Sequence, residues 1–230
     1  MNKTILITGG AGFIGSNLIE LLIKNDNFHI ICMDNFFTGK MENIEKFINK
    51  NNFTLINQDI IDPINIDRDI NEIYHLACPA SPPKYQIDPV YTLKINFIGT
   101  MNLLELALKK KAKILFTSTS EIYGEPLVSP QNENYRGNVN TIGIRSCYDE
   151  GKRIAETLFF DYQRLYNLDI RVARIFNTYG PRMTINDGRV MSNFIVQALN
   201  HKPLTIYGDG LQTRSFLLVD ECIEGIMKLM

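Results

Sequence analysis

The chain has 230 residues, of which 45% are hydrophobic and 21% charged, a composition typical of globular proteins that bury a substantial core. Its 24 basic and 25 acidic residues leave a formal net charge of -1, so no broad basic field is available to hold nucleic acid or an anionic membrane surface. No apolar run approaches the roughly 18 residues that a membrane span needs, and the N-terminus lacks the regions of a signal peptide. We therefore expect a cytoplasmic protein with no nucleic-acid and no membrane partner.

Short apolar runs alternate with longer helical patterns along the chain, as they do in β-α-β units. The expected strands span residues 4–8, 29–33, 53–57, 72–76, 113–117 and 170–175. The expected helices span residues 13–24, 89–110 and 148–166. This alternation predicts an α/β fold in which a doubly wound parallel sheet is covered by helices on both faces.

The pattern changes after residue 178, where loops rich in Gly, Pro and Asn precede a further helix and a strand-like run over residues 204–207. We therefore divide the chain into a dinucleotide-binding domain over residues 1–178 and a smaller substrate-binding lobe over residues 179–230. The amphipathic run over residues 219–230 contains no Asn or Pro to end it, so we expect this lobe to be incomplete.

Four cysteines lie far apart in the sequence, without C-x-x-C spacing and without neighbouring histidines. This distribution argues against a zinc site and against a dense disulfide framework. We expect free thiols and no bound metal.

A glycine-rich turn follows the first expected strand and opens the first expected helix, with Gly9, Gly12 and Gly15 at the fingerprint positions. A tight turn requires unusual backbone angles, a pyrophosphate requires backbone N–H groups at a helix N-terminus, and a third glycine lets helix and strand approach each other. The Gly-x-x-Gly-x-x-Gly spacing favours the short-chain dehydrogenase branch of the dinucleotide-binding folds.

The second expected strand ends near Asp34, 19 residues past Gly15. A carboxylate there can accept hydrogen bonds from both ribose hydroxyls of NAD and would repel the 2′-phosphate of NADP, so NAD is the expected cofactor. Asp59 taken alone is equally consistent with a helix cap. The residues expected to line the cofactor site are Gly9, Gly12, Phe13, Ile14, Gly15, Asp34, Asn35, Thr38, Gly39, Asp59, Ile60, Leu76, Ala77, Tyr148 and Lys152.

Tyr148 and Lys152 stand at i and i+4, on one face of an expected helix. A lysine cation beside the phenol favours the phenolate and lowers a tyrosine pKa that is about 10 when unperturbed, so Tyr148 could act as a base near neutrality. The alternative is that Tyr148 and Lys152 are simply a pair of side chains on an exposed helix surface. Their position after the fifth expected strand disfavours that alternative. We expect Thr119 to bridge a substrate hydroxyl to the tyrosine, Ser120 to donate to a substrate oxygen, and Glu121 to move a proton at a sugar carbon.

These residues resemble the extended short-chain dehydrogenases that act on nucleotide sugars, and most closely the UDP-glucuronate decarboxylase (UDP-xylose synthase) branch. The resemblance covers essentially the whole chain. Its most distinctive runs are residues 77–83 and 145–153, and residues 118–124, 173–183 and 186–190 are also similar.

The resemblance implies a redox-neutral cycle on tightly bound NAD, in which UDP-glucuronate is oxidised at C4, loses CO₂ and is reduced again to UDP-xylose. It also implies a homodimer formed through the helices over residues 89–110 and 148–166. The residues expected to face the nucleotide sugar are Lys94, Asn177, Arg189, Tyr207 and Arg214. For Lys94, a solvated helix side chain is the competing interpretation.

Two related activities and one non-catalytic role stay open at this point. A 4,6-dehydratase carries an aspartate where Ser120 stands, and a neutral serine avoids repelling a substrate carboxylate. A UDP-sugar 4-epimerase shares Tyr148 and Lys152. Relatives continue past the equivalent of Met230 and place there an arginine near the sugar carboxylate, so a dinucleotide-binding protein without catalysis is the third possibility.

Overall fold

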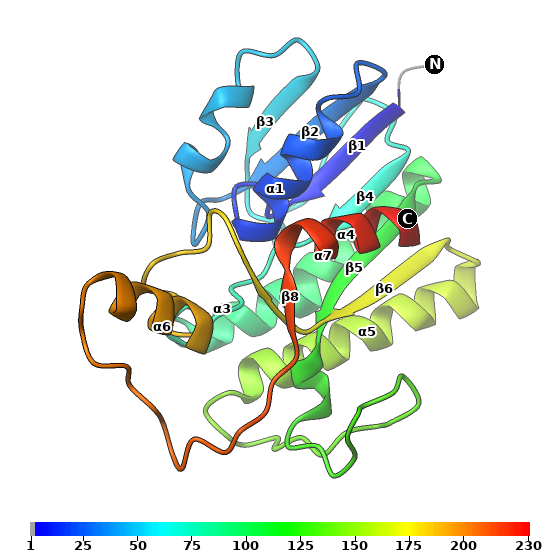
Figure 1. Cartoon of the computed structure of the whole chain (residues 1–230). Helices are drawn as coiled ribbons and strands as arrows, with labels where there is room; N and C mark the ends of the chain where they lie inside the picture. The colour runs from blue at the N-terminus through cyan, green and yellow to red at the C-terminus, as the bar shows by residue number, and fades with distance from the viewer. Residues whose placement is uncertain (1–2) are drawn as a thin grey trace.

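The computed structural model describes residues 3–230, and six of its strands form one parallel sheet in the order β3-β2-β1-β4-β5-β6 (Figure 1). This is the doubly wound arrangement, in which the strand order reverses between β1 and β4. The strands are β1 (Lys3–Thr8), β2 (Phe28–Asp34), β3 (Phe53–Asn57), β4 (Glu72–His75), β5 (Lys113–Thr119) and β6 (Ile170–Ile175). The predicted fold class is confirmed, and each of these strands begins and ends close to its expected bounds.

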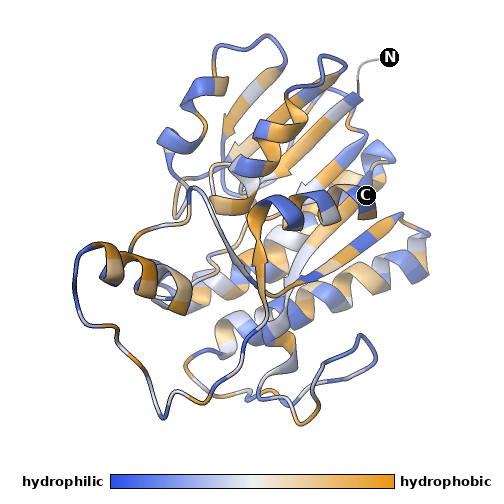
Figure 2. Cartoon of the chain, viewed as in Figure 1, coloured by the Kyte–Doolittle hydropathy of each residue, from blue (hydrophilic) through white to orange (hydrophobic). Residues whose placement is uncertain are grey.

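Helices cover both faces of the sheet (Figure 1). One face packs against α1 (Phe13–Leu22) and α7 (Val219–Leu229), and the other packs against α4 (Thr100–Lys110) and α5 (Ser146–Tyr166). Side chains alternate along each strand, so Ile5 and Ile7 of β1 join the first core and Leu6 joins the second. Figure 2 shows the hydrophobic residues gathered in the strands and on the helix faces that meet them.

The helix expected over residues 89–110 is present but is divided by a π turn. It consists of α3 (Pro89–Lys94), the π turn η3 (Ile95–Gly99) and α4. Within the turn, the Asn96 side-chain amide donates to the Thr92 carbonyl at 2.8 Å and to the Cys78 sulfur at 3.2 Å. A π turn inside a helix frequently lies at a functional site, and this one lies against the segment that follows β4.

Short elements complete the fold. They are the 3₁₀ turns η1 (Met41–Asn43) and η2 (Glu45–Phe47), the helix α2 (Pro82–Tyr85), the 3₁₀ turn η4 (Ser120–Tyr123), the strands β7 (Asn177–Tyr179) and β8 (Phe216–Leu218), and the helix α6 (Val190–Leu199). No helix within residues 3–230 has the length and apolar character that crossing a membrane would require. The four cysteines are free, as expected.

The region after β6 differs most from the sequence expectations. β7 and β8 form a parallel pair that the sequence did not predict, whereas the expected strand over residues 204–207 is irregular and exposed. A β-rich run becomes a strand only when another strand pairs with it, and here the Thr205 N–H donates to the Gln197 side chain instead, at 3.0 Å. The division at residue 178 stays a prediction, and α7, which it assigns to the second lobe, packs on the core beside α1.

The packing of α5 on the sheet yields a stability prediction. The Phe159 ring of α5 is fully buried and stacks on Phe116 of β5, with ring centroids 5.1 Å apart. Phe159→Ala should lower the free energy of unfolding by about 3–5 kcal/mol, because it leaves a cavity in a closely packed core. Urea denaturation measures this loss.

The control is Leu165→Ala on the same helix, where the side chain is 72% exposed. This change should alter the free energy of unfolding by no more than about 0.5 kcal/mol. Equal losses in the two variants would contradict the packing described for Phe159.

Candidate active site

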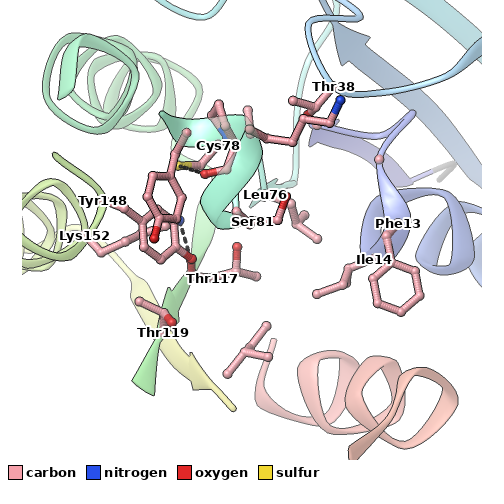
Figure 3. A pocket seen from close by; sticks show the side chains of 18 of the residues that line it. Phe13, Ile14, Thr38, Leu76, Cys78, Ser81, Thr117, Thr119, Tyr148 and Lys152 are labelled. Atoms are coloured by element: carbon pink, nitrogen blue, oxygen red, sulfur yellow. Dashed lines mark hydrogen bonds between the residues drawn. The ribbon is translucent and has the colours of Figure 1, made fainter. Parts of the chain in front are cut away.

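A cleft of about 700 Å³ opens at the carboxyl ends of the sheet strands, where the strand order reverses. All the residues predicted for the cofactor, catalytic and substrate sites line this cleft except Gly39 and Lys94. Figure 3 shows Thr119, Tyr148 and Lys152 on one side of the cleft and Phe13 and Ile14 on the other. The cleft therefore joins the predicted glycine turn to the predicted catalytic set.

The glycine turn between β1 and α1 leaves no room for side chains. A Cβ atom on Gly9, whose φ is +71°, would lie 2.8 Å from the Ala77 backbone, and one on Gly15 would lie 2.3 Å from the Gly9 carbonyl oxygen. Gly12 caps α1, whose first turn contains no acidic side chain. The N-terminus of α1 thus brings its backbone N–H groups to the cleft wall, where they can bind a phosphate.

The carboxylate at the end of β2 is fixed by the backbone. Asp34 is buried and accepts hydrogen bonds from the N–H groups of Ala11 at 2.9 Å and Phe36 at 2.8 Å. Burial raises its pKa, and the two hydrogen bonds oppose that rise. Gly39 does not line the cleft, but a Cβ there would lie 2.8 Å from an Asp34 oxygen, so this glycine makes room for the carboxylate.

Asp59 belongs to a hydrogen-bonded group at the same end of the cleft. Asn35 donates to Asp59 Oδ2 at 2.7 Å, the Tyr91 hydroxyl also donates to that carboxylate, and Ile61 N–H donates to its other oxygen at 3.0 Å. Burial and the hydrogen bond to Asp59 raise the pKa of Tyr91. Its ring lies 4.9 Å from the Phe37 ring. Sequence reasoning missed Tyr91 and Phe37, because neither belongs to a recognisable motif.

The predicted Tyr-Lys pair lies on α5, and both side chains are buried. The Lys152 ammonium donates to the Thr117 carbonyl at 2.9 Å and lies 4.6 Å from the centre of the Phe116 ring. Burial lowers the pKa of Lys152, whereas Cys78 and Glu156 act in the opposite direction. The ammonium is 5.8 Å from the centre of the Tyr148 ring.

The pKa of Tyr148 is raised in this arrangement, contrary to the sequence expectation. Burial is the largest cause and the nearby Cys78 thiol adds to it, whereas a hydrogen bond with Thr119 and the charge of Arg189 lower the pKa. The expected lowering by Lys152 is not met, because the ammonium is directed at a backbone carbonyl rather than at the phenol. The Thr119 hydroxyl is the group whose hydrogen bond lowers the Tyr148 pKa, and its expected role of bridging a substrate hydroxyl to the tyrosine stays a prediction.

A second tyrosine supports the first. Tyr85, at the end of α2, is fully buried and stacks on Tyr148 with ring centroids 5.0 Å apart and planes inclined by 8°. The stacked ring fixes the orientation of the Tyr148 side chain. The run over residues 77–83 marked this neighbourhood only by resemblance, and Tyr85 itself was missed.

The end of β5 carries the remaining catalytic candidates. The Thr119 side chain caps η4 by accepting from the Glu121 N–H at 3.2 Å, so Thr119 is also a turn former. Glu121 forms an ion pair with Arg145 at the start of α5, and both line the cleft. Arg145 belongs to the run over residues 145–153, but its contact with Glu121 was not predicted.

The residues predicted to bind the substrate reach the cleft from the part of the chain after β6, with the exception of Lys94. Asn177, Arg189, Tyr207 and Arg214 line it, and Arg189 is held by Asp187 at 2.9 Å. Lys94 lies at the exposed end of α3 and outside the cleft, in agreement with the solvated alternative.

Comparison with known proteins gives matches over the whole chain. A family model described as GDP-mannose 4,6 dehydratase matches residues 6–230. UDP-glucuronic acid decarboxylase 6 from Arabidopsis thaliana is 57% identical over 229 residues, which are 100% of this chain and 66% of that protein. UDP-glucuronic acid decarboxylase 1 from Danio rerio is 54% identical over 228 residues, which are 99% of this chain and 54% of that protein. The chain thus spans between half and two thirds of the length of these relatives.

Solved structures agree with the sequence matches. A UDP-N-acetylglucosamine 4-epimerase from Methanobrevibacter ruminantium M1, in complex with UDP-N-acetylmuramic acid, superimposes with a TM-score of 0.89 at 31% identity, covering 99% of this chain and 73% of that one. A UDP-glucuronic acid 4-epimerase from Bacillus cereus, in complex with UDP-glucuronic acid and NAD, superimposes with a TM-score of 0.84 at 34% identity. The match covers 97% of this chain and 72% of that one. The chain therefore belongs to the GDP-mannose 4,6-dehydratase family, within the extended short-chain dehydrogenases that act on nucleotide sugars.

Proposed function

We propose that this chain carries the catalytic machinery of a decarboxylase that converts UDP-glucuronate to UDP-xylose. The observation that carries the proposal is a single cleft that joins a glycine turn and the buried Asp34 carboxylate to Thr119, Tyr148 and Lys152. The 57% identity to a protein named as UDP-glucuronic acid decarboxylase supports this substrate.

NAD is the cofactor that this cleft fits best. The turn from Gly9 to Gly15 admits a pyrophosphate where a Cβ would clash with backbone, and the buried Asp34 carboxylate suits a ribose with two free hydroxyls. No Lys or Arg lies between Asp34 and Gly39 to neutralise a 2′-phosphate. NAD⁺, when bound, supplies a hydride acceptor whose reduced form returns the hydride later in the same turnover.

The side chains of the cleft divide the remaining chemistry among them. Tyr148 removes the proton of the sugar 4-hydroxyl, and the Thr119 hydroxyl, whose hydrogen bond lowers the Tyr148 pKa, orients that group. Once C4 is a ketone, the carboxylate on C5 leaves as CO₂, because the electron pair of the broken bond between C5 and the carboxylate carbon passes into an enolate with the C4 ketone. Glu121 then serves as the proton donor for C5, and the neutral Ser120 avoids repulsion of the substrate carboxylate.

A 4-epimerase of UDP-glucuronate is the second candidate. It is favoured by the similarity to the Bacillus cereus epimerase, whose structure holds UDP-glucuronic acid and NAD. Both reactions begin with the same removal of a proton by a tyrosine, and they differ in whether CO₂ leaves. A 4,6-dehydratase is less suited to this cleft, since Ser120 is a poor acid for expelling a hydroxyl as water.

We also propose that the protein forms a homodimer through α3, η3 and α5. Apolar side chains stand exposed along these neighbouring helices: Val90, Leu93, Phe97, Ile154 and Phe160. Exposed apolar side chains on neighbouring helices are often covered by a partner, and a two-fold axis would let the same helices cover each other.

The reaction itself is the first test. Purified protein incubated with UDP-glucuronate and NAD⁺ should release CO₂ and form UDP-xylose, measured by trapping labelled CO₂ and by chromatography of the nucleotide sugars. Formation of UDP-galacturonate without CO₂ would instead assign the 4-epimerase activity.

Tyr148→Phe tests the proposed base within the same assay. Turnover should fall by about 100-fold or more, because the phenol oxygen that takes the proton is removed, while NAD still binds. Tyr166→Phe, at a position on α5 that is 57% exposed, is the matched control and should leave turnover unchanged. Unimpaired turnover in Tyr148→Phe would remove this residue from the mechanism.

Cofactor preference is the next prediction. Cofactor-stripped protein should bind NADP about tenfold or more weakly than NAD, because the 2′-phosphate meets the Asp34 carboxylate without a neighbouring cation. Titration with each dinucleotide, followed by fluorescence, measures both affinities. Asp34→Asn should narrow this ratio, whereas the exposed Asp62→Asn should not change it. Equal or tighter binding of NADP by the unmodified protein would show that Asp34 does not contact the ribose.

Self-association has a separate prediction. Light scattering at micromolar concentration should give the mass of a dimer, and Val90→Glu/Phe97→Glu should give a monomer because it buries charge in the proposed interface. Ile142→Glu, at a position that is 92% exposed and outside these helices, should stay dimeric. A monomer mass for the unmodified protein would contradict the proposal.

A further inference from the structure

An ion pair between the buried Glu156 and the half-buried Arg174 lies directly behind the catalytic residues. Glu156 follows Lys152 by one turn on α5 and is buried at 8% exposure. Arg174 of β6 reaches it with two parallel hydrogen bonds, from Nε to Oε1 at 3.0 Å and from Nη2 to Oε2 at 2.8 Å. This two-pronged contact fixes the direction of both side chains.

The pair also contacts the strand and the loop that carry the other catalytic candidates. The Ser118 hydroxyl, one residue before Thr119 on β5, donates to Glu156. Arg174 Nη1 donates to the Tyr123 hydroxyl at 2.9 Å and to the Glu133 carbonyl at 3.0 Å. The carboxylate of Glu156 and the guanidinium of Arg174 therefore connect five parts of the chain: β5, η4, the loop after η4, α5 and β6.

Stability alone does not explain why an ion pair, rather than apolar side chains, joins these elements. Removing two charges from water is costly, and apolar side chains of similar volume often stabilise a core as well as a buried ion pair does. An ion pair differs from apolar packing in direction, because its hydrogen bonds set the angle and distance between the elements that they join. Here those elements are the two halves of the catalytic set, α5 with Tyr148 and Lys152 and the end of β5 with Thr119 and Glu121.

We infer that Glu156 and Arg174 are positioning residues, which hold the end of β5 and the loop after η4 in place against the catalytic helix. Neither side chain lines the cleft, so they act through Ser118 and Tyr123 rather than on the substrate. The inference rests on the proposed function only in its choice of Thr119, Glu121, Tyr148 and Lys152 as the catalytic set. A displacement of about 1 Å between such groups is enough to reduce turnover strongly.

The test separates positioning from stability by removing one charge or both. Arg174→Met leaves the buried Glu156 carboxylate without its partner, so it should lower the melting temperature by about 6 °C or more, and Glu156→Gln, which leaves the half-buried Arg174, should lower it by less. The double variant Glu156→Met/Arg174→Met leaves neither partner of the pair behind and should recover part of that loss, although Lys152 then lacks the compensating charge of Glu156. If the pair positions the catalytic set, turnover in the double variant should stay about tenfold or more below that of the unmodified protein.

Two further measurements identify the cause of that loss. The KM for the nucleotide sugar and the Kd for NAD should stay within about threefold of their original values, so that the effect falls on kcat. Hydrogen exchange should become faster over residues 120–136 in the double variant. The loop should loosen rather than detach, because Arg153 of α5 still binds the carbonyls of Ile122 and Arg136, each at 2.9 Å.

Glu224→Gln/Lys228→Gln is the control. It removes an exposed ion pair on α7, outside the helices of the proposed dimer interface, and should change neither the exchange of residues 120–136 nor turnover. A double variant at Glu156 and Arg174 with partly recovered melting temperature, original kcat and original exchange would overturn the inference. Because exchange requires no substrate, it decides the matter even if the unmodified protein does not act on UDP-glucuronate, an outcome that would count against the proposed function alone.

Discussion

The close approach of the first turn to the end of the fourth strand is the constraint on which the cleft depends. Gly9 brings the turn so near to the Ala77 backbone, and Gly15 brings the start of α1 so near to the backbone of Gly9, that even a methyl group on either would collide with main-chain atoms. Because of this contact, the N-terminus of α1 opens at the point where the strand order reverses. Asp34, Asp59 and Thr119 then reach the same cleft simply because parallel strands end at one edge of the sheet.

The features that the sequence predicted well are those written in local patterns. Alternating apolar runs define the strands, and the glycine turn, Asp34 and the Tyr148–Lys152 spacing each lie within a short segment. Tyr91 and Asp59, in contrast, are 32 residues apart, and nothing near either residue indicates the hydrogen bond between them. Tyr85 and Arg145 were missed for the same reason. The expected strand over residues 204–207 was wrong because strand formation depends on a partner that a local pattern does not specify.

The charge of Lys152, beside Tyr148, is balanced by a group that does not contact it directly. Lys152 is buried without a carboxylate in direct contact, and Glu156 compensates it from one helical turn away while being itself paired with Arg174. The direction of the Tyr148 pKa shift follows from this arrangement, since burial dominates and the nearest cation is directed elsewhere. The Tyr-x-x-x-Lys spacing identifies Tyr148 and Lys152 as neighbours on one helix face, but it does not determine which groups each side chain contacts.

The pairing of β7 with β8 has a consequence for how the proposed substrate contacts can vary. Arg189, Tyr207 and Arg214 all lie in the excursion between these two strands, and Asn177 stands opposite Phe216 where its two ends are joined. The excursion is closed at its base by a backbone ladder, so a change in its length or composition need not be transmitted to the six-stranded sheet. Under the proposed function, replacing this one loop would change the residues offered to the sugar, while the proposed dinucleotide and proton-transfer residues stay as they are.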